Sequence, residues 1–338
     1  MESVSPDLFS GNIIKTRIRL ARNISGYRFC GNDERTSREI VKKVNRALIK
    51  CDTFNLYYVA NVSETVLEAM KERNLISKYL TENAVGGAAL INADESLSVM
   101  INEEDVIREQ CFMKGLRLKE AYERLDGLDD ELSKNVDIAF HPRWGYLTAC
   151  PTNLGTGMRA SVMLFLPALS ESGKIRKVTE EARKAGLTVR GVYGEGSVAE
   201  GSIYQISNEV TLGISEYDIL KSVEEAVLDI CMTERELAKK LYISKEIKTM
   251  DRAKRAFGVL TNAVLLSYEE FLSLIAEVKI GAMFGMIDVQ DLEALNDLTV
   301  KVRPANLCVQ YGKELSAFDR DLFRAEVVSK KLLKLREI

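Results

Sequence analysis

The chain has 338 residues, of which 46% are apolar and 29% are charged, and its net charge is −3. This composition is typical of a protein with a sizeable buried core, and the charge excludes a bulk attraction to nucleic acid or to an anionic membrane. No apolar run approaches the roughly 20 residues that a membrane-spanning helix needs, and the first residues lack the pattern of a secretory signal. We therefore expect a cytoplasmic protein that has neither a nucleic acid nor a membrane as its partner.

The cysteine and histidine content narrows the chemistry. Six cysteines are spread along the chain without a C-x-x-C pair, which predicts free thiols in a reducing compartment. His141 is the one histidine in the sequence, so a His-rich zinc site is nearly excluded and a Ser-His-Asp triad would need that residue. The sequence therefore predicts no metal ligands.

In chain order, the first 230 residues mix helix and strand patterns. The spacing of Ile, Val and Leu predicts a helix over 38–50, and alternation predicts strands at 97–101, in parts of 137–148, at 187–193 and at 203–212. Few of these strands are separated by a full helix, as a parallel sheet would require. We therefore predict an α+β fold, in which helices flank a mainly antiparallel sheet.

The pattern changes after Gly213. Ser215 and Ser267 each precede an acidic residue three positions later, as helix N-caps often do. The segments that follow are rich in Glu, Lys, Leu and Ala and predict helices. We expect a catalytic domain over 1–234 and an all-helical domain over 235–338.

Arginines supply the first chemical signal, because the sequence has neither a P-loop nor a complete G-x-G-x-x-G motif. Arg17 and Arg19 would share one face of a strand, Arg159 follows a Gly-Thr-Gly turn, and Arg190 precedes another glycine. Neighbouring guanidinium groups repel each other unless an anion lies between them, and their planar forks suit phosphate oxygens. The alternative is a solvated, charged edge strand.

Acidic residues and one cysteine lie close to these arginines in the sequence. Glu104 belongs to N-E-E-D at 102–105, just before Arg108, and Glu195 lies in a glycine-flanked turn that can hold a carboxylate rigidly. Cys150 begins C-P-T-N-L-G-T, where free backbone donors could activate a thiol. Taken singly, each acid could be an exposed turn residue, and the cysteine could be a small core residue.

Together these segments resemble the phosphagen kinases, which are the ATP:guanido phosphotransferases. The resemblance covers roughly residues 10–232 and favours one branch, the bacterial protein-arginine kinases of the McsB type. Because Arg17 comes so early, we expect the helical N-terminal domain of the small-substrate members to be missing and a helical C-terminal region to follow instead. The matching segments are T-R-I-R at 16–19, N-E-E-D at 102–105, C-P-T-N-L-G-T at 150–156, G-T-G-M-R-A-S at 155–161 and R-G-V-Y-G-E at 190–195.

The resemblance implies ATP and Mg²⁺ as cofactors and assigns roles to individual residues. Glu104 and Glu195 would grip the substrate guanidinium, and Cys150 would be the reactive cysteine beside it. The arginines implied to hold the nucleotide phosphates are Arg17, Arg19, Arg108, Arg159 and Arg190. The other residues implied at the nucleotide are Thr16, Ile18, Asn74, Ala160, Ser161, Val162, Met163, Gly191, Val192, Tyr193, Gly194 and again Glu195.

Near the C-terminus, R-D-L-F-R-A at 320–325 resembles a phosphoarginine-binding motif of the branch, formed here by Arg320, Asp321, Arg324 and Ala325. Without the resemblance, an Asp321–Arg324 pair on a helix surface would be the simpler interpretation. The implied partners are protein substrates with exposed arginines, a zinc-binding activator protein, a heat-shock repressor and a Clp-type unfoldase-protease. The helical region is expected to form a homodimer.

Some positions depart from the family. Val106 and Ile107 follow N-E-E-D where a His is common, Asn74 stands where the branch usually has a nucleotide-side His, and Lys15 replaces a common Ser. Met163 replaces the adenine-side His of small-substrate members, as is usual in this branch. Two alternatives therefore stay open: a kinase of small guanidines, and a non-catalytic adaptor that binds phosphoarginine.

Overall fold

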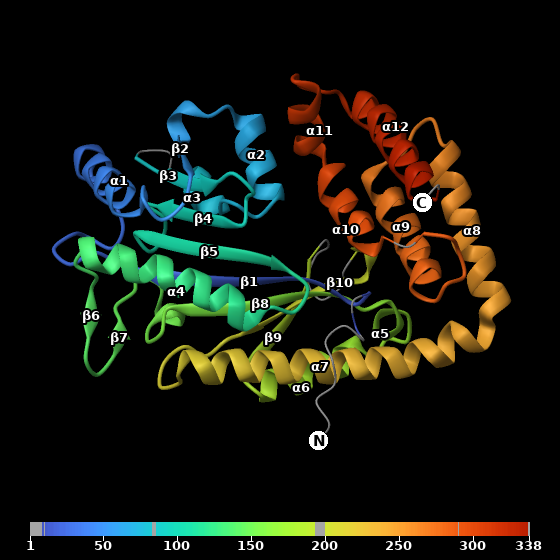
Figure 1. Cartoon of the computed structure of the whole chain (residues 1–338), viewed down its shortest axis with the longest axis horizontal. Coiled ribbons are helices and arrows are strands. Elements are labelled where there is room, and N and C mark those ends of the chain that lie inside the picture. Colours follow the sequence, from blue (N-terminus) through green and yellow to red (C-terminus); the bar gives the residue numbers. More distant parts are fainter. Residues whose placement is uncertain (1–8, 10, 83–85, 193–199, 290, 337–338) are drawn as a thin grey trace.

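The computed structural model describes residues 9, 11–82, 86–192, 200–289 and 291–336 (Figure 1). Its main feature is an eight-stranded sheet with the strand order β2-β3-β4-β5-β1-β8-β10-β9, in which every neighbouring pair is antiparallel. The strands are β1 (Ile13–Arg22), β2 (Phe54–Tyr58), β3 (Ala88–Asn92), β4 (Leu97–Ile101), β5 (Ile107–Lys114), β8 (Met158–Phe165), β9 (Leu187–Gly191) and β10 (Ile203–Asn208).

The predicted strands are largely confirmed. The strand at 97–101 is β4, and the predictions at 187–193 and 203–212 correspond to the shorter strands β9 and β10. The segment 137–148 contains only a short hairpin of two strands with two residues each, β6 (Phe140–His141) and β7 (Gly145–Tyr146). The helix expected at 38–50 is α1 (Glu34–Leu48), which begins four residues earlier because Asp33 accepts a hydrogen bond from the backbone N–H of Thr36 as its N-cap.

One face of the sheet is covered by helices and forms the larger core. Ile18, Leu20, Ala160 and Val162 alternate with polar residues along β1 and β8, and all four are buried. They pack with residues of α1, α4 (Leu118–Asn135), α6 (Ile175–Lys184) and α7 (Glu216–Leu241), and Figure 1 shows α4 and α7 running along the same side of the sheet. The opposite face is covered at its β3–β4 end by α2 (Glu64–Glu72) and α3 (Lys78–Glu82) around a smaller apolar cluster.

The C-terminal part is helical, as expected, and surrounds a second core. The two predicted capping serines are confirmed, since Ser215 accepts from the Asp218 N–H at the start of α7 and Ser267 accepts from the Glu270 N–H at the start of α9. Helix α7 continues unbroken across residue 235, and its buried Glu234 accepts hydrogen bonds from the backbone of α5 (Pro167–Glu171). The remaining helices are α8 (Glu246–Asn262), α9 (Tyr268–Met283), α10 (Leu292–Lys301), α11 (Pro304–Tyr311) and α12 (Ala317–Arg336).

These features confirm the α+β class, with an antiparallel sheet, flanking helices and a helical C-terminal region. Within the described residues, none of the helices combines the length and the apolar character needed to traverse a bilayer.

Candidate active site

The register of the sheet brings the predicted arginines onto one face. In an antiparallel sheet, residues directly opposite each other point to the same side. Arg19 of β1 lies opposite Arg159 of β8 and opposite Gln110 of β5, which is two residues from Arg108. Arg190 of β9 lies opposite Gln205 of β10, which in turn lies opposite Met163 of β8. Arg17, two residues before Arg19, completes this group. We call these five arginines the arginine face.

The alternative of a solvated edge strand is wrong, because β1 lies between β5 and β8 in the middle of the sheet. Four of the five arginines are partly buried, and Arg190 is exposed. Burial, with repulsion from Arg159 and Arg108, lowers the pKa of Arg17 to about 10. Burial and the other arginines also lower the pKa of Arg19 well below its usual value. The Nε atom of Arg19 is buried and has no hydrogen-bond partner among the described residues. Such a cluster has the charge and the free donors that an anion with several oxygens requires.

Two neutral side chains that the sequence did not single out orient the arginines. Arg17 Nη2 donates to Gln205 Oε1 at 3.0 Å, and Arg159 Nη2 donates to Ser207 Oγ at 3.0 Å. Both acceptors lie on β10, and the alternation along I-Y-Q-I-S-N could have placed them on one face. Because neither acceptor carries a charge, neither offsets the positive charge of the cluster.

The predicted acidic motif adjoins this face. Glu103 is buried, and its carboxylate forms an ion pair with Arg108 Nη1 at 2.7 Å. It also accepts hydrogen bonds from Ser77 Oγ at 2.6 Å and from the Glu104 N–H at 2.7 Å. Glu104 Oε2 lies 3.7 Å from Arg108 Nη2, and 44% of its side chain is exposed. Glu103 therefore positions Arg108 and the backbone of Glu104, and the Glu104 carboxylate remains accessible to a ligand.

Asp105, the last residue of the same motif, holds the loop of Cys150. Its buried carboxylate accepts from Asn23 Nδ2 at 3.0 Å, from the Ala149 N–H at 2.6 Å and from Asn153 Nδ2 at 2.7 Å. The last two donors flank Cys150, which is half-buried and whose Sγ lies 3.1 Å from Thr152 Oγ1. The structure therefore joins the N-E-E-D and C-P-T-N motifs, which are more than 40 residues apart in the sequence.

Other predicted nucleotide residues divide between the two faces. Ser161 and Met163 share the face of Arg17 and Arg19. The side chains of Thr16, Ile18, Ala160 and Val162 lie on the covered face, because neighbouring strand residues point to opposite sides. Gly191 ends β9 and Val192 follows it, whereas Tyr193, Gly194 and Glu195 lie outside the described residues.

Asn74, one of the positions that depart from the family, has a role in the backbone turn that ends α2. Its φ of 64° is left-handed, a conformation that Asn adopts more readily than most residues. Its N–H donates to Lys71 O, and the Leu75 N–H donates to Met70 O, which is the Schellman arrangement that closes a helix. Asn74 thus ends α2, and its carbonyl accepts from Gln110 Nε2 at 3.2 Å beside the arginine face. The Val106 departure is accommodated in the main core.

The R-D-L-F-R-A segment lies at the start of α12. Arg324 is 1% exposed, and its guanidinium donates to Val302 O at 3.0 Å, to Leu266 O at 2.7 Å and to Asp321 Oδ1 at 2.6 Å. Arg320 is half-buried and donates to Leu315 O, and Ala325 is buried. The Asp321–Arg324 pair therefore exists, and 36% of the Asp321 side chain is exposed. Its arginine, however, is buried and ties α12 to two loops, unlike an arginine on a helix surface.

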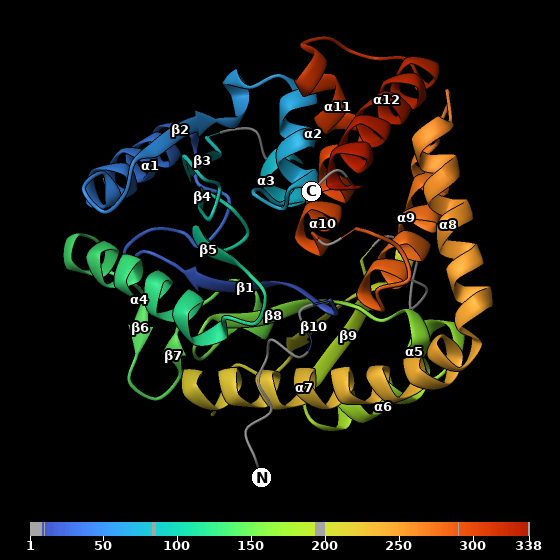
Figure 2. The same ribbon diagram turned by 45° about the vertical axis from the view of Figure 1, so that its right-hand side comes forward.

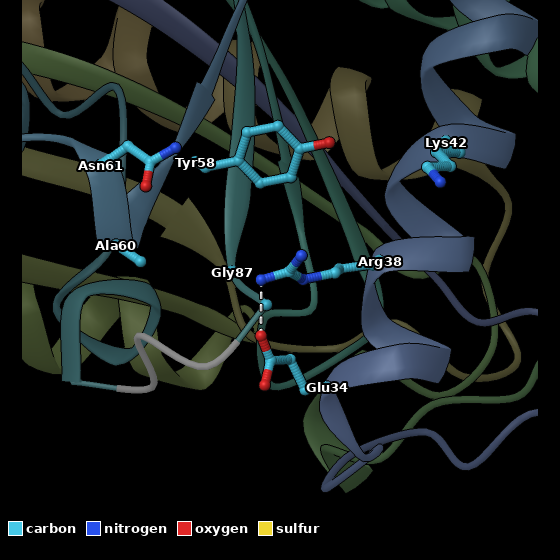
Figure 3. Close-up of a pocket in the computed structure, with 8 residues that line it drawn as sticks. Glu34, Arg38, Lys42, Tyr58, Ala60, Asn61 and Gly87 are labelled. Carbon is cyan, nitrogen blue, oxygen red and sulfur yellow. Dashed lines mark hydrogen bonds and ion pairs between the residues drawn. The ribbon is translucent and has the colours of Figure 1, made fainter.

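A separate cavity of about 410 Å³ lies between α1 and β2 (Figure 3). Arg38 and Glu34 form an ion pair across its wall at 2.6 Å, and Lys42 and Tyr58 also line it. None of the predicted site residues lines this cavity, so it is distinct from the arginine face. No group of three or more His, Cys, Asp or Glu side chains that could hold a metal ion occurs in the described part of the chain.

The sequence is similar to those of known proteins. Residues 36–237 match the family described as the C-terminal catalytic domain of ATP:guanido phosphotransferase, and residues 246–337 match the C-terminal domain of the protein-arginine kinase McsB. The protein-arginine kinase of Caldanaerobacter subterraneus subsp. tengcongensis is 40% identical over 95% of this chain and 97% of that protein. The protein-arginine kinase of Halothermothrix orenii is 42% identical over 95% of this chain and 93% of that protein.

Solved structures of related kinases have the same fold. The duplicated taurocyamine kinase of Schistosoma mansoni, with bound transition state analog components, aligns with a TM-score of 0.64 and 26% identity. That alignment covers 75% of this chain but only 38% of the longer, duplicated one. Lombricine kinase aligns with a TM-score of 0.60 and 25% identity over 69% of each chain. The chain therefore belongs to the ATP:guanido phosphotransferase family, and within that family to the protein-arginine kinases.

Proposed function

We propose that this chain transfers the γ-phosphoryl group of ATP to a guanidinium nitrogen of an arginine side chain in a protein. The arginine face is the observation that carries the proposal. Burial and the neighbouring arginines lower the pKa of Arg17 and of Arg19, and the buried Arg19 Nε lacks a partner among the described residues, as expected of a site that is neutralised by a polyphosphate. Family membership and the names of the relatives support the choice of ATP and of a protein substrate.

At the phosphate end, Arg17, Arg19, Arg108, Arg159 and Arg190 hold the nucleotide oxygens. Mg²⁺ in such sites is bound mainly by phosphate oxygens and water, which fits the lack of a three-ligand protein cluster among the described residues. When bound, the ion supplies further neutralisation of phosphate charge. The arginines align the transferring group and stabilise the charge on its equatorial oxygens as it moves.

At the substrate end, the nucleophile must lose a proton. The pKa of a guanidinium lies above 12, so its nitrogen attacks only when a base takes the proton. Glu104, beside Arg108, orients the guanidinium together with Glu195, and one of the two carboxylates accepts the proton. A P–N bond forms, the bond between the γ-phosphorus and the bridging oxygen breaks, and ADP leaves. Asp105 fixes the loop that places Cys150 next to this reaction.

Mass spectrometry after incubation with Mg-ATP and a protein substrate tests the proposal. The wild type is expected to form acid-labile, hydroxylamine-sensitive phosphoarginine, and Glu104→Gln and Glu195→Ala are expected to abolish it without unfolding the protein. Glu39→Gln, on the exposed side of α1, is the matched control and should keep full activity. Full activity in Glu104→Gln and Glu195→Ala would refute the roles of the two glutamates.

Two alternatives have distinct outcomes in the same assay. The solved relatives are named for small guanidine substrates, so free arginine, creatine and taurocyamine belong beside the protein substrate. Turnover of a small guanidine without modification of protein would identify a small-guanidine kinase. Binding of phosphoarginine peptides without binding of Mg-ATP would identify a non-catalytic adaptor.

The C-terminal region is assigned a supporting role. We propose a catalytic domain over 1–234 and a helical domain over 235–338 that binds phosphoarginine through Arg320, Asp321, Arg324 and Ala325 and that forms a homodimer. The proposed setting is the cytoplasm during stress, with allosteric control and with a zinc-binding activator, a heat-shock repressor and a Clp unfoldase-protease as partners. Titration with a phosphoarginine peptide tests the binding site, and loss of binding in Asp321→Ala is the expected result.

A further inference from the structure

The end of α2 joins the C-terminal helices to the catalytic half of the molecule. Figures 1 and 2 both show α2 lying beside α11. Glu72, the last residue of α2, accepts hydrogen bonds from the Ala305 N–H at 3.0 Å and from the Asn306 N–H at 2.9 Å, in the first turn of α11. The side chain of Arg303, the N-cap residue of α11, makes no capping hydrogen bond in the described structure. Glu72 therefore supplies the cap from another element, and its charge suits the N-terminus of a helix.

Three further contacts fix this junction. Arg303 Nη1 donates to the backbone carbonyl of Glu72 at 2.9 Å, and Arg73 Nη1 donates to Asn306 Oδ1 at 2.5 Å. The Asn306 side chain also donates to Val300 O at the end of α10. The side chains and backbone of residues 72 and 73 are thus held by the start of α11, which Asn306 in turn connects to α10.

The residues that follow run directly to the catalytic machinery. After the left-handed turn at Asn74, the Leu75 carbonyl accepts from Ser98 Oγ at 2.6 Å and from Gln110 Nε2 at 3.2 Å. Two residues later, Ser77 Oγ donates to Glu103 Oε1 at 2.6 Å. Glu103 is the carboxylate that holds Arg108 and accepts from the Glu104 backbone. A path therefore leads from α11 to Arg108 and Glu104 through hydrogen bonds, the backbone of residues 72–77 and the Glu103–Arg108 ion pair.

We propose that Glu72 is a positioning residue for phosphoryl transfer, because it transmits the placement of the C-terminal helices through residues 72–77 to Glu103, Arg108 and Glu104. In this view the C-terminal helices complete the catalytic centre without touching the reacting atoms. The inference rests on the kinase activity proposed above and adds a residue and a direction of control to it. Transfer depends on alignment to within about 1 Å, so a small displacement of residues 72–77 has a large effect on rate.

Glu72→Gln tests the proposal in the full-length protein. The amide keeps one acceptor oxygen but sets its NH2 group against one of the two backbone N–H donors. One capping hydrogen bond and the negative charge are therefore lost, while the size of the side chain is kept. We expect kcat for protein phosphorylation to fall by about tenfold or more, with the KM for Mg-ATP changed by less than about threefold. Glu68→Gln is the matched control, because Glu68 lies on the same helix and pairs with Lys71 at the surface. It should keep the wild-type kcat.

A second variant separates positioning from a general loss of structure. Ser77→Ala removes the hydrogen bond to Glu103 further along the same set of contacts and leaves α11 untouched. If Glu72 acts through Ser77, the double variant has the kcat of the slower single variant and not the product of the two losses. Thermal unfolding of each variant, measured beside the kinetics, confirms that the assayed protein is folded.

The outcomes are distinct. A wild type without phosphoarginine activity would refute the proposed function itself. An active wild type together with a Glu72→Gln variant within about twofold of its kcat would overturn the positioning role alone. Multiplicative losses in the double variant would also overturn it, because Glu72 and Ser77 would then act independently.

Discussion

Arg19 carries a charge that its protein neighbours do not neutralise, whereas Arg22, three residues on, carries one that they do. Arg22 lies on the covered face and pairs with Asp129 at 2.7 Å, with both side chains buried. On the arginine face, burial and then Arg17, Arg108 and Arg159 lower the pKa of Arg19, and Glu103 opposes them with a smaller effect. The same residue type on one strand therefore has opposite consequences for the stability of the nucleotide-free protein.

We predict that Arg19→Ala raises the midpoint of thermal unfolding without nucleotide and weakens Mg-ATP binding by about tenfold to a hundredfold, as expected for the loss of a charged hydrogen bond. Arg22→Ala is the contrasting variant. It should lower the free energy of unfolding by about 3–5 kcal/mol, because it leaves the Asp129 carboxylate buried and unpaired. Calorimetry with and without Mg-ATP measures both quantities. An Arg19→Ala protein that is less stable and binds Mg-ATP normally would contradict the interpretation.

Glu109, on the covered side of β5, should make the free energy of unfolding depend on pH. It is fully buried, neither carboxylate oxygen has a hydrogen-bond partner within the described residues, and burial, followed by the nearby Asp129, raises its pKa well above the usual value. The folded protein therefore keeps a proton that the unfolded chain releases above about pH 4.3. The contribution of Glu109 to the free energy of unfolding is therefore greatest at low pH. It falls by about 1.4 kcal/mol per pH unit as the pH rises, until the pH reaches the pKa of Glu109 in the folded protein.

Glu109→Gln removes this proton equilibrium. The variant should be more stable than the wild type at pH 7 to 8, and its stability should change less between pH 5 and pH 8. Chemical denaturation at each pH measures the difference. A steeper pH dependence in the variant would show that another buried group is responsible.

At the scale of elements, substitutions of Asn74 distinguish its structural role in the turn that ends α2 from a role in nucleotide binding. Asn74→Gly preserves the left-handed conformation, whereas Asn74→Ala should lower the free energy of unfolding by about 1 kcal/mol. If the Asn74 side chain also contacts the nucleotide, as the resemblance implies, both variants will bind Mg-ATP more weakly. We expect Asn74→Gly to match the wild type in stability, and its Mg-ATP affinity then decides the second role.

The elements that the sequence predicted well are those specified by neighbouring residues. β4 follows from local alternation, and the starts of α7 and α9 follow from the serines that cap them. The hairpin at 140–146 was predicted less well because its segment is held by distant groups, including the hydrogen bond from the Ala139 N–H to Asn23 O. Long-range hydrogen bonds of this kind leave no periodic signal in one sequence.

The same distinction applies to the site. The alternation of Arg17 and Arg19 was visible in the sequence, but their meeting with Arg108, Arg159 and Arg190 depends on the register of five strands. Asp105 was visible as part of a motif, yet its hold on the Cys150 loop appears only when the chain is folded. Gln205 and Ser207 were missed because neutral residues on a strand carry no chemical signal of their own.

At the scale of the whole molecule, the question is whether the two apolar cores unfold in one cooperative transition or in two separate ones. The larger core contains the sheet and α7, and it includes Ile280 of α9, while the second core lies among α8, α9, α10 and α12. Helix α7 passes from one half to the other, and Glu72 joins α2 to α11. These connections favour cooperative unfolding, in which a ligand of the sheet also stabilises the C-terminal helices.

Leu90→Ala in the larger core and Leu295→Ala in the second core test this cooperativity, since both leucines are fully buried. Each substitution should lower the free energy of unfolding by about 2–5 kcal/mol. Mg-ATP at a hundred times its Kd adds about 2.7 kcal/mol to any unit that unfolds together with its site. Scanning calorimetry should therefore show one transition in both variants, shifted upward by Mg-ATP in each. A separate transition in Leu295→Ala that does not shift with Mg-ATP would mean that the C-terminal helices unfold independently. Mg-ATP would then stabilise the sheet and α7 but not the second core, because a ligand stabilises only the unit that unfolds together with its site.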